Sequence, residues 1–196
     1  MDKLKTRNSY QNIVKQAKKL FLKHGIHRVT VQEICKEASV SKMTFYRMFK
    51  NKEDVAEKVL LEISENNIQS YRDIMKQDIP FAKRIEQMLE WKQTTSTEFS
   101  EEFIKDVFNL KESNLKTHFE EYRQKLTNEL LNDLKTAQKD GWIRKDVKLT
   151  FVLYMLNDIN EKLRDERFLA MYSNIKEAGM ELTKFVFSGI MSNENK

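Results

Sequence analysis

Apolar residues recur every three or four positions along most of the chain, and this spacing predicts amphipathic helices. The first stripe runs from Tyr10 to Phe21, and Gly25 follows it at the place where a glycine commonly ends a helix. Thr30 and Glu33 have the spacing of a capping box, in which each side chain accepts a hydrogen bond from the other residue's main-chain N–H. A second helix is therefore expected to begin directly after Thr30.

A polar break at 39–41 separates this second helix, expected over 31–38, from a third. Ser41 has a side chain suited to an N-cap, and a helix over 42–48 would turn Phe45 inward. Two short helices joined by a three-residue turn form a helix-turn-helix unit. Because helices of this length are not stable alone, the first helix and the start of the fourth must hold them.

Beyond this unit the helical spacing continues almost to the end of the chain. No Gly or Pro interrupts it before Pro80, so one long helix is expected over 52–76. The other expected features are a helix that begins at Pro80, a loop at 94–97, a short helix capped by Ser100, a long helix closed by Asp140 and Gly141, and two final helices over 146–163 and 167–190.

The last two helices have the character of an interface. The helix over 146–163 is apolar around nearly its whole circumference, which indicates burial, at a chain end often against another subunit. Gly179 and Gly189 lie inside the helix over 167–190, where each glycine costs about 1 kcal/mol. A second backbone approaching closely would explain both glycines, so a homodimer through these two helices is expected.

The composition agrees with an all-helical fold. Four Gly and one Pro in 196 residues are far fewer than the turns of sandwiches, barrels or α/β folds require. The single cysteine, Cys35, excludes an internal disulfide and a thiolate zinc site. The longest apolar run, 151–156, is too short to cross a bilayer, and the first residues carry no signal-peptide pattern. A cytoplasmic protein without a membrane contact is expected.

The net charge of +5 hides an asymmetry along the chain. Residues 1–60 carry 14 Lys and Arg against 6 Asp and Glu, a balance of +8, whereas residues 61–196 have a balance of −3. This distribution indicates a basic module that meets a polyanion, attached to a body that does not.

The stretch from Ile13 to Leu60 resembles the DNA-binding domain of the TetR family of bacterial transcriptional repressors. The segments that carry the resemblance are Ala17-x-x-Leu20-Phe21, His24-Gly25, Thr30-Val31-x-x-Ile34, Ala38-x-Val40-Ser41-Lys42-x-Thr44-Phe45-Tyr46 and Phe49-x-Asn51-Lys52-Glu53. The resemblance implies an all-α protein with an N-terminal three-helix helix-turn-helix DNA-binding domain over 1–50. A larger helical ligand-binding and dimerisation domain would follow over 51–196.

The second helix of a helix-turn-helix enters the major groove of DNA, and residues near its N-terminus face the base edges. The residues expected there are Ser41, Lys42, Met43, Thr44 and Arg47. Lys42 or Arg47 could donate to guanine, and Met43 offers only apolar contact, suited to a thymine methyl.

The resemblance implies phosphate contacts by Tyr46, Lys52 and Thr30, and a short basic arm at residues 3–7 is also suited to the DNA backbone. Tyr46 could instead be a core aromatic residue with a surface hydroxyl, and Thr30 caps its helix in either case. Met43 and Met48 depart from the family's usual residues, so the operator sequence cannot be transferred from the family.

The second domain is rich in aromatic and methionine side chains that could line an apolar ligand pocket or form ordinary core. The candidate ligand-binding residues are Trp91, Phe103, Phe108, Phe119, Tyr122, Tyr154, Asn157 and Asp158. Asn157 and Asp158 could equally be hydrogen-bonded at the dimer interface. His24 and His27 have no third ligand nearby, so no metal site is expected, and nothing points to a cofactor.

Taken together, these features predict a homodimeric, ligand-responsive repressor. The helix at 42–48 of each protomer would read one half of a palindromic operator in double-stranded DNA, and an apolar or amphipathic small molecule would act as effector. The alternative is a helical dimer that binds a small molecule or protein partner without specific DNA recognition. An enzyme is not expected, because no phosphate loop, nucleophile elbow or His-Glu-x-x-His motif is present.

Overall fold

The computed structural model describes residues 2–109 and 114–192, with backbone alone at 2–5, 108, 114–119, 123 and 160. The described residues are predominantly helical, and the one isolated β-bridge among them joins Ile143 and Met191. The chain divides into two compact units. Unit 1 comprises Met1–Asn67 and Glu98–His118, and unit 2 comprises Ile68–Thr97 and Phe119–Lys196.

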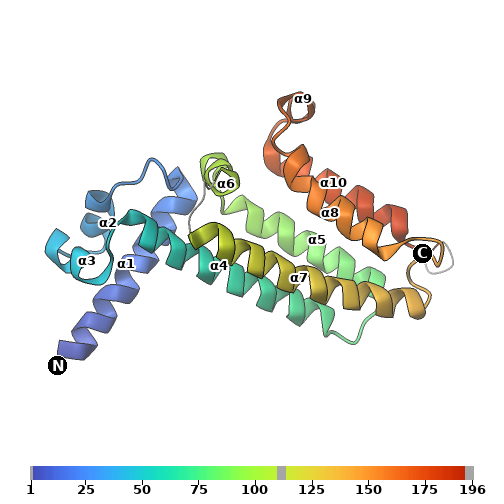
Figure 1. The fold of residues 1–196 in the computed structure, drawn as a ribbon, viewed down its shortest axis with the longest axis horizontal. Helices are drawn as coiled ribbons and strands as arrows, with labels where there is room; N and C mark the ends of the chain where they lie inside the picture. The colour runs from blue at the N-terminus through green and yellow to red at the C-terminus, as the bar shows by residue number, and fades with distance from the viewer. Residues whose placement is uncertain (1, 110–113, 193–196) are drawn as a thin grey trace. The chain divides into compact units, whose positions relative to one another are not determined.

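Unit 1 contains the predicted helix-turn-helix and one later helix. Its elements are α1 (Asp2–His24), α2 (Val31–Glu37), α3 (Lys42–Met48), the first part of α4 (Lys52–Met75) and α6 (Glu101–Phe108). Helix α1 packs against both α2 and α6, and α2 packs against α3 (Figure 1). The core includes the fully buried Phe21, Ile34, Phe45 and Val55, one side chain from each of the first four helices.

The predicted Ser41 cap and the helix end at Gly25 are confirmed, and Asn51 caps α4. Ser41 caps α3 by accepting the main-chain N–H of Thr44 at 3.0 Å, and Asn51 accepts that of Asp54 at 2.9 Å at the start of α4. Gly25 ends α1 with a φ of +82°, a left-handed conformation that favours glycine. Local polar side chains thus set the boundaries of these short helices.

Unit 2 is helical and has its own apolar core. Its helices are the end of α4, α5 (Phe81–Thr97), α7 (Asn114–Lys139), α8 (Leu149–Lys162), α9 (Glu166–Leu169) and α10 (Ile175–Ile190), with the first turn of α7 assigned to unit 1. Helix α10 packs against both α5 and α8, and α8 and α10 run side by side (Figure 1). The buried core of unit 2 includes Phe81, Leu134, Ile143, Val152 and Phe187.

Several predicted element boundaries are wrong. Residues 94–97 are helical and complete α5, and three of their hydroxyls donate to carbonyls within the helix, as Thr94 does to Glu90. The predicted helix over 167–190 is two helices, because the Asn174 side chain accepts the N–H groups of Lys176 and Glu177 and so starts α10 anew. Helix α8 begins at Leu149 rather than near 146. The basic arm expected at residues 3–7 belongs to α1, and its contact with DNA stays a prediction.

The two units also differ from the domain boundary expected at residue 50. Unit 1 extends to Asn67 and takes in α6 from a later part of the chain. The functional division at residue 50 stays a prediction. Within residues 2–109 and 114–192, no helix has both the length and the apolar character that crossing a membrane requires.

Candidate nucleic-acid interface

Helix α3 combines a buried anchor with an exposed outer face. The Phe45 side chain is fully buried, and its ring contacts that of Phe49 at a centroid distance of 5.7 Å. On the opposite side Met43 is 82% exposed and Tyr46 is 55% exposed. Lys42 and Arg47 are exposed as well, so α3 presents two cations, one apolar side chain and one phenol. Tyr46 is therefore not a core residue.

The hydroxyls at the start of α3 are engaged with each other. The Ser41 and Thr44 hydroxyl oxygens lie 2.9 Å apart, and Ser41 also accepts the Thr44 main-chain N–H. This pair fixes the first turn of the helix. A role in base contacts for these two hydroxyls stays a prediction.

Thr30 is occupied by the capping box. Its hydroxyl accepts the Glu33 main-chain N–H at 3.2 Å, and the Glu33 carboxylate accepts both the Thr30 N–H and the Thr30 hydroxyl at 2.8 Å. The hydrogen bond from the Thr30 backbone is the largest cause that lowers the pKa of Glu33. The Glu33 carboxylate thus already occupies the N-terminus of α2, where an anion would bind. A phosphate contact by Thr30 stays a prediction.

Lys52 is directed at main-chain carbonyls. Its ammonium donates to the carbonyl oxygens of Ile26 at 2.8 Å and His27 at 2.9 Å, in the loop after α1. An ammonium has three protons, so one remains for a further acceptor such as a phosphate. The structure therefore gives Lys52 a role in holding the helix-turn-helix, which the sequence alone did not indicate, and its phosphate contact stays a prediction.

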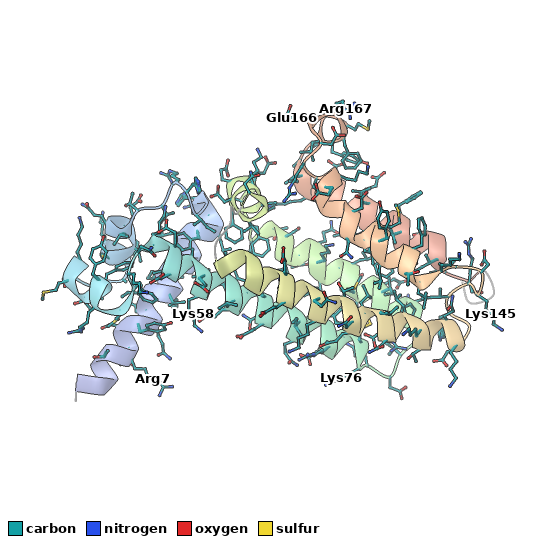
Figure 2. All side chains as sticks on the ribbon, viewed as in Figure 1. Arg7, Lys58, Lys76, Lys145, Glu166 and Arg167 are labelled. Atoms are coloured by element: carbon teal, nitrogen blue, oxygen red, sulfur yellow. The ribbon has the colours of Figure 1, made fainter. Side chains whose placement is uncertain are left out.

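Helix α6 is attached to the same loop from another side. The Asp106 carboxylate accepts the main-chain N–H of His27 at 2.9 Å, and the main-chain N–H of Ser100 donates to the Leu22 carbonyl at 2.8 Å. These contacts join segments about 80 residues apart, and no local sequence signal marks Asp106. Arg7 projects from the first turns of α1 (Figure 2).

The candidate ligand residues are distributed over both units. Phe103 is buried in unit 1, Trp91 and Tyr122 are half-buried in unit 2, and burial raises the pKa of Tyr122 to about 12. Tyr154 and Asn157 are exposed on α8, and Asp158 lies 3.8 Å from Lys162 in an ion pair. Phe108 and Phe119 lie outside the described side chains. Their joint role in ligand binding stays a prediction.

The fold and the exposed α3 face define a helix-turn-helix transcriptional regulator. The family model "Bacterial regulatory proteins, tetR family" matches residues 13–59. The HTH-type transcriptional regulator YvkB of Bacillus subtilis (strain 168) is 30% identical over 144 residues, which cover 70% of this chain and 72% of the relative. The chain belongs to the TetR family of bacterial regulatory proteins, a class that generally has no enzymatic activity, and its helix-turn-helix is the DNA-binding domain.

Solved structures share this fold over nearly the whole chain. A Saccharomonospora viridis protein in complex with choline has a TM-score of 0.74 at 16% identity, covering 93% of this chain and 97% of that one. SmeT, the repressor of the Stenotrophomonas maltophilia multidrug efflux pump SmeDEF, in complex with triclosan has a TM-score of 0.70 at 15% identity, covering 96% and 94%. At these identities the likeness concerns the fold.

Proposed function

We propose that the protein is a homodimeric, ligand-responsive repressor that reads a palindromic operator with α3. The observation that carries the proposal is the arrangement of α3, in which Phe45 is fully buried while Met43 and Tyr46 are exposed. A short helix anchored in this way can enter a major groove without losing its packing. Lys42 and Arg47 supply donors for guanine or phosphate, and Met43 supplies apolar contact for a thymine methyl.

The exposed face of unit 2 supports a dimer. Phe151 and Tyr154 on α8 and Phe185 on α10 are 59%, 66% and 74% exposed in the single chain. A groove of about 530 Å³ runs between α8 and α10, lined mainly by apolar atoms of residues such as Phe151, Met155 and Phe185. A β-carbon added at Gly189 would meet nothing within 4 Å, so this side of α10 is open to a second helix. An exposed apolar surface of this kind marks a partner site, and a second copy fits it.

The small-molecule effector is inferred from relatives of the same fold. Two of them were solved with choline and with triclosan, an ammonium compound and a chlorinated phenol of small size. For the effector to release DNA, it must bind the DNA-competent and incompetent states with different affinities. The effector of this protein is expected to be apolar or amphipathic and to bind in the helical body beyond the helix-turn-helix.

Selection of random duplex DNA by the purified full chain at near-physiological salt tests the proposal. The expected result is an enriched palindrome whose half-sites lie about one helical turn apart or slightly more. Weak binding without a consensus would contradict the repressor and would favour a dimer that recognises a small molecule or protein partner.

Charge-matched variants separate base reading from general attraction to DNA. Arg47→Ala on α3 is expected to change the enriched bases, because it removes a donor at the groove. Lys145→Ala removes the same charge in the segment before α8 (Figure 2) and is expected to leave the consensus unchanged. An unchanged consensus in Arg47→Ala and Lys42→Ala alike would contradict readout by α3.

A further inference from the structure

A lysine interrupts the buried stripe of α5. Phe81, Ile85 and Met88 occupy successive positions on one face of this helix and are 1%, 3% and 8% exposed. Lys92 stands four residues after Met88 and so continues the same face. The periodicity calls for an apolar side chain at this position, where α5 packs against α10.

Lys92 meets a polar residue that interrupts the buried face of α10. Its ammonium donates to the Thr183 hydroxyl at 3.1 Å, and Thr183 is 2% exposed. The Thr183 hydroxyl in turn donates to the Gly179 carbonyl at 2.8 Å, which holds its oxygen toward the lysine. The α5–α10 contact therefore contains a polar pair. The Thr183 hydroxyl accepts from Lys92 and donates to the Gly179 carbonyl.

The ammonium of Lys92 lacks a counter-ion within the described part of the chain. No carboxylate there lies within ion-pair distance of it. Burial lowers the pKa of Lys92, and no acidic group opposes this effect. The residue as a whole is exposed, so part of the side chain stays in contact with solvent. An ammonium that is partly desolvated and has no carboxylate partner favours an anion.

We propose that Lys92, held in place by Thr183, binds the carboxylate of an amphipathic effector. Lys92 donates one of its three ammonium protons to Thr183, and two remain for the carboxylate oxygens. A single cation matches a monoanion better than a phosphate, which needs more donors.

This inference rests on the proposed function, since it names the chemical class of the effector. Direct binding to the full chain without DNA tests it by calorimetry with octanoate, decanoate and dodecanoate. The matched probes are the 1-alkanols and alkyltrimethylammonium ions of the same chain lengths. The best carboxylate is expected to bind about 10- to 100-fold more tightly than its alcohol, the range for a charge-assisted hydrogen bond.

Variants at Lys92 link this preference to the proposed site. Lys92→Gln keeps a donor for Thr183 without the charge and is expected to bring the carboxylate-to-alcohol ratio close to 1, whereas Lys92→Arg retains a preference for the carboxylate. Thr183→Val removes the hydroxyl at nearly constant volume and is expected to reduce the ratio by a smaller factor. If Lys92→Gln fails to fold, the wild-type ratio and Thr183→Val still decide.

Three results would overturn the proposal. These are a wild-type ratio near 1, a ratio that is unchanged in Lys92→Gln, and tightest binding of the alkyltrimethylammonium ion. Each of these leaves the selection of operator DNA unaffected. A failed DNA selection would likewise leave the direct binding ratio intact, so the two proposals fail separately.

Discussion

The Asp106 carboxylate on α6 accepts a hydrogen bond from the main-chain N–H of His27 at 2.9 Å. Gly25, two residues earlier, makes this approach possible: a β-carbon there would lie 2.7 Å from an Asp106 carboxylate oxygen. The φ of +82° at Gly25 independently favours glycine. The end of α1 and the body of α6 are thus fitted to each other within unit 1.

A double-mutant cycle measures this fit. Gly25→Ala is expected to lower the free energy of unfolding by about 1–3 kcal/mol, through backbone strain and through contact with Asp106. In an Asp106→Ala background the same change is expected to cost less, because the crowded carboxylate is gone. Backbone strain and the approach to the Glu102 β-carbon, at 3.1 Å, remain. Equal costs in both backgrounds, measured by denaturant titration, would show that Asp106 does not crowd position 25.

Lys52 gives a second prediction about the same loop. Lys52→Met removes the donors to the Ile26 and His27 carbonyls and is expected to destabilise the protein by about 1–3 kcal/mol. Lys50→Met is the matched control, since it removes the same charge from a nearby exposed side chain. The measurement is the denaturant midpoint. Similar midpoints for the two variants would contradict a structural role for Lys52 and would leave it free for DNA.

The Arg72–Glu129 ion pair between α4 and α7 predicts a pH dependence of stability. Arg72 donates from its Nε to Glu129 at 2.9 Å, and this hydrogen bonding is the largest cause that lowers the Glu129 pKa. The Glu129 carboxylate therefore binds a proton less readily in the folded state than in the unfolded chain. The stabilisation is complete above the unfolded pKa and is lost as pH falls through the folded one.

Glu129→Gln tests this pH dependence by thermal unfolding. The variant is expected to lose less stability than the wild type between about pH 5 and pH 3. Glu120→Gln, an exposed position on the same helix, is expected to keep the wild-type pH profile. Parallel profiles for the wild type and Glu129→Gln would contradict the assignment.

The apolar α8–α10 face predicts the oligomeric state. Phe185→Glu places a charge on a side chain that is 74% exposed in the single chain, and it is expected to convert a dimer into monomers. Met43→Glu makes the same kind of change at an equally exposed residue of α3 and is expected to leave the dimer intact. Sedimentation velocity distinguishes the two. A monomeric wild type, or a dimeric Phe185→Glu, would contradict this interface.

Local signals predicted the helix-turn-helix well. The capping box at Thr30 and Glu33, the Ser41 cap and the left-handed Gly25 are contained in a few neighbouring residues, and each was found where expected. The long helix expected over 52–76 agrees with α4, which spans Lys52–Met75. These features depend on short-range hydrogen bonds and helical periodicity, which a single sequence displays.

Boundaries that depend on competing local bonds were harder to predict. Four consecutive hydroxyl-bearing residues at 94–97 suggested a loop, but Thr94, Ser96 and Thr97 donate to carbonyls of α5, which continues through them. Asn174 restarts α10 inside a stripe that was continuous by periodicity. In both places a side-chain hydrogen bond accompanies the observed helix boundary. The spacing of apolar residues contains no information about such bonds.

Local sequence signals did not predict the contacts between residues that are far apart in the chain. The contacts of Lys52 and Asp106 with the loop after α1 span 25 and 79 residues, and that of Lys92 with Thr183 spans 91. Neither Lys92 nor Thr183 was singled out from the sequence. Only the packing of α5 on α10 shows that they belong together.

The most direct test of the central claim compares an enriched palindrome with a version in which one half-site is scrambled. Fluorescence anisotropy at near-physiological salt gives both affinities. If two α3 helices read the site together, scrambling one half is expected to weaken wild-type binding by at least about 10²-fold, since each mismatched base pair costs about 1–3 kcal/mol. Monomeric Phe185→Glu is expected to show a much smaller difference between the two duplexes. Equal wild-type affinity for both would contradict a dimer that reads its operator with paired α3 helices.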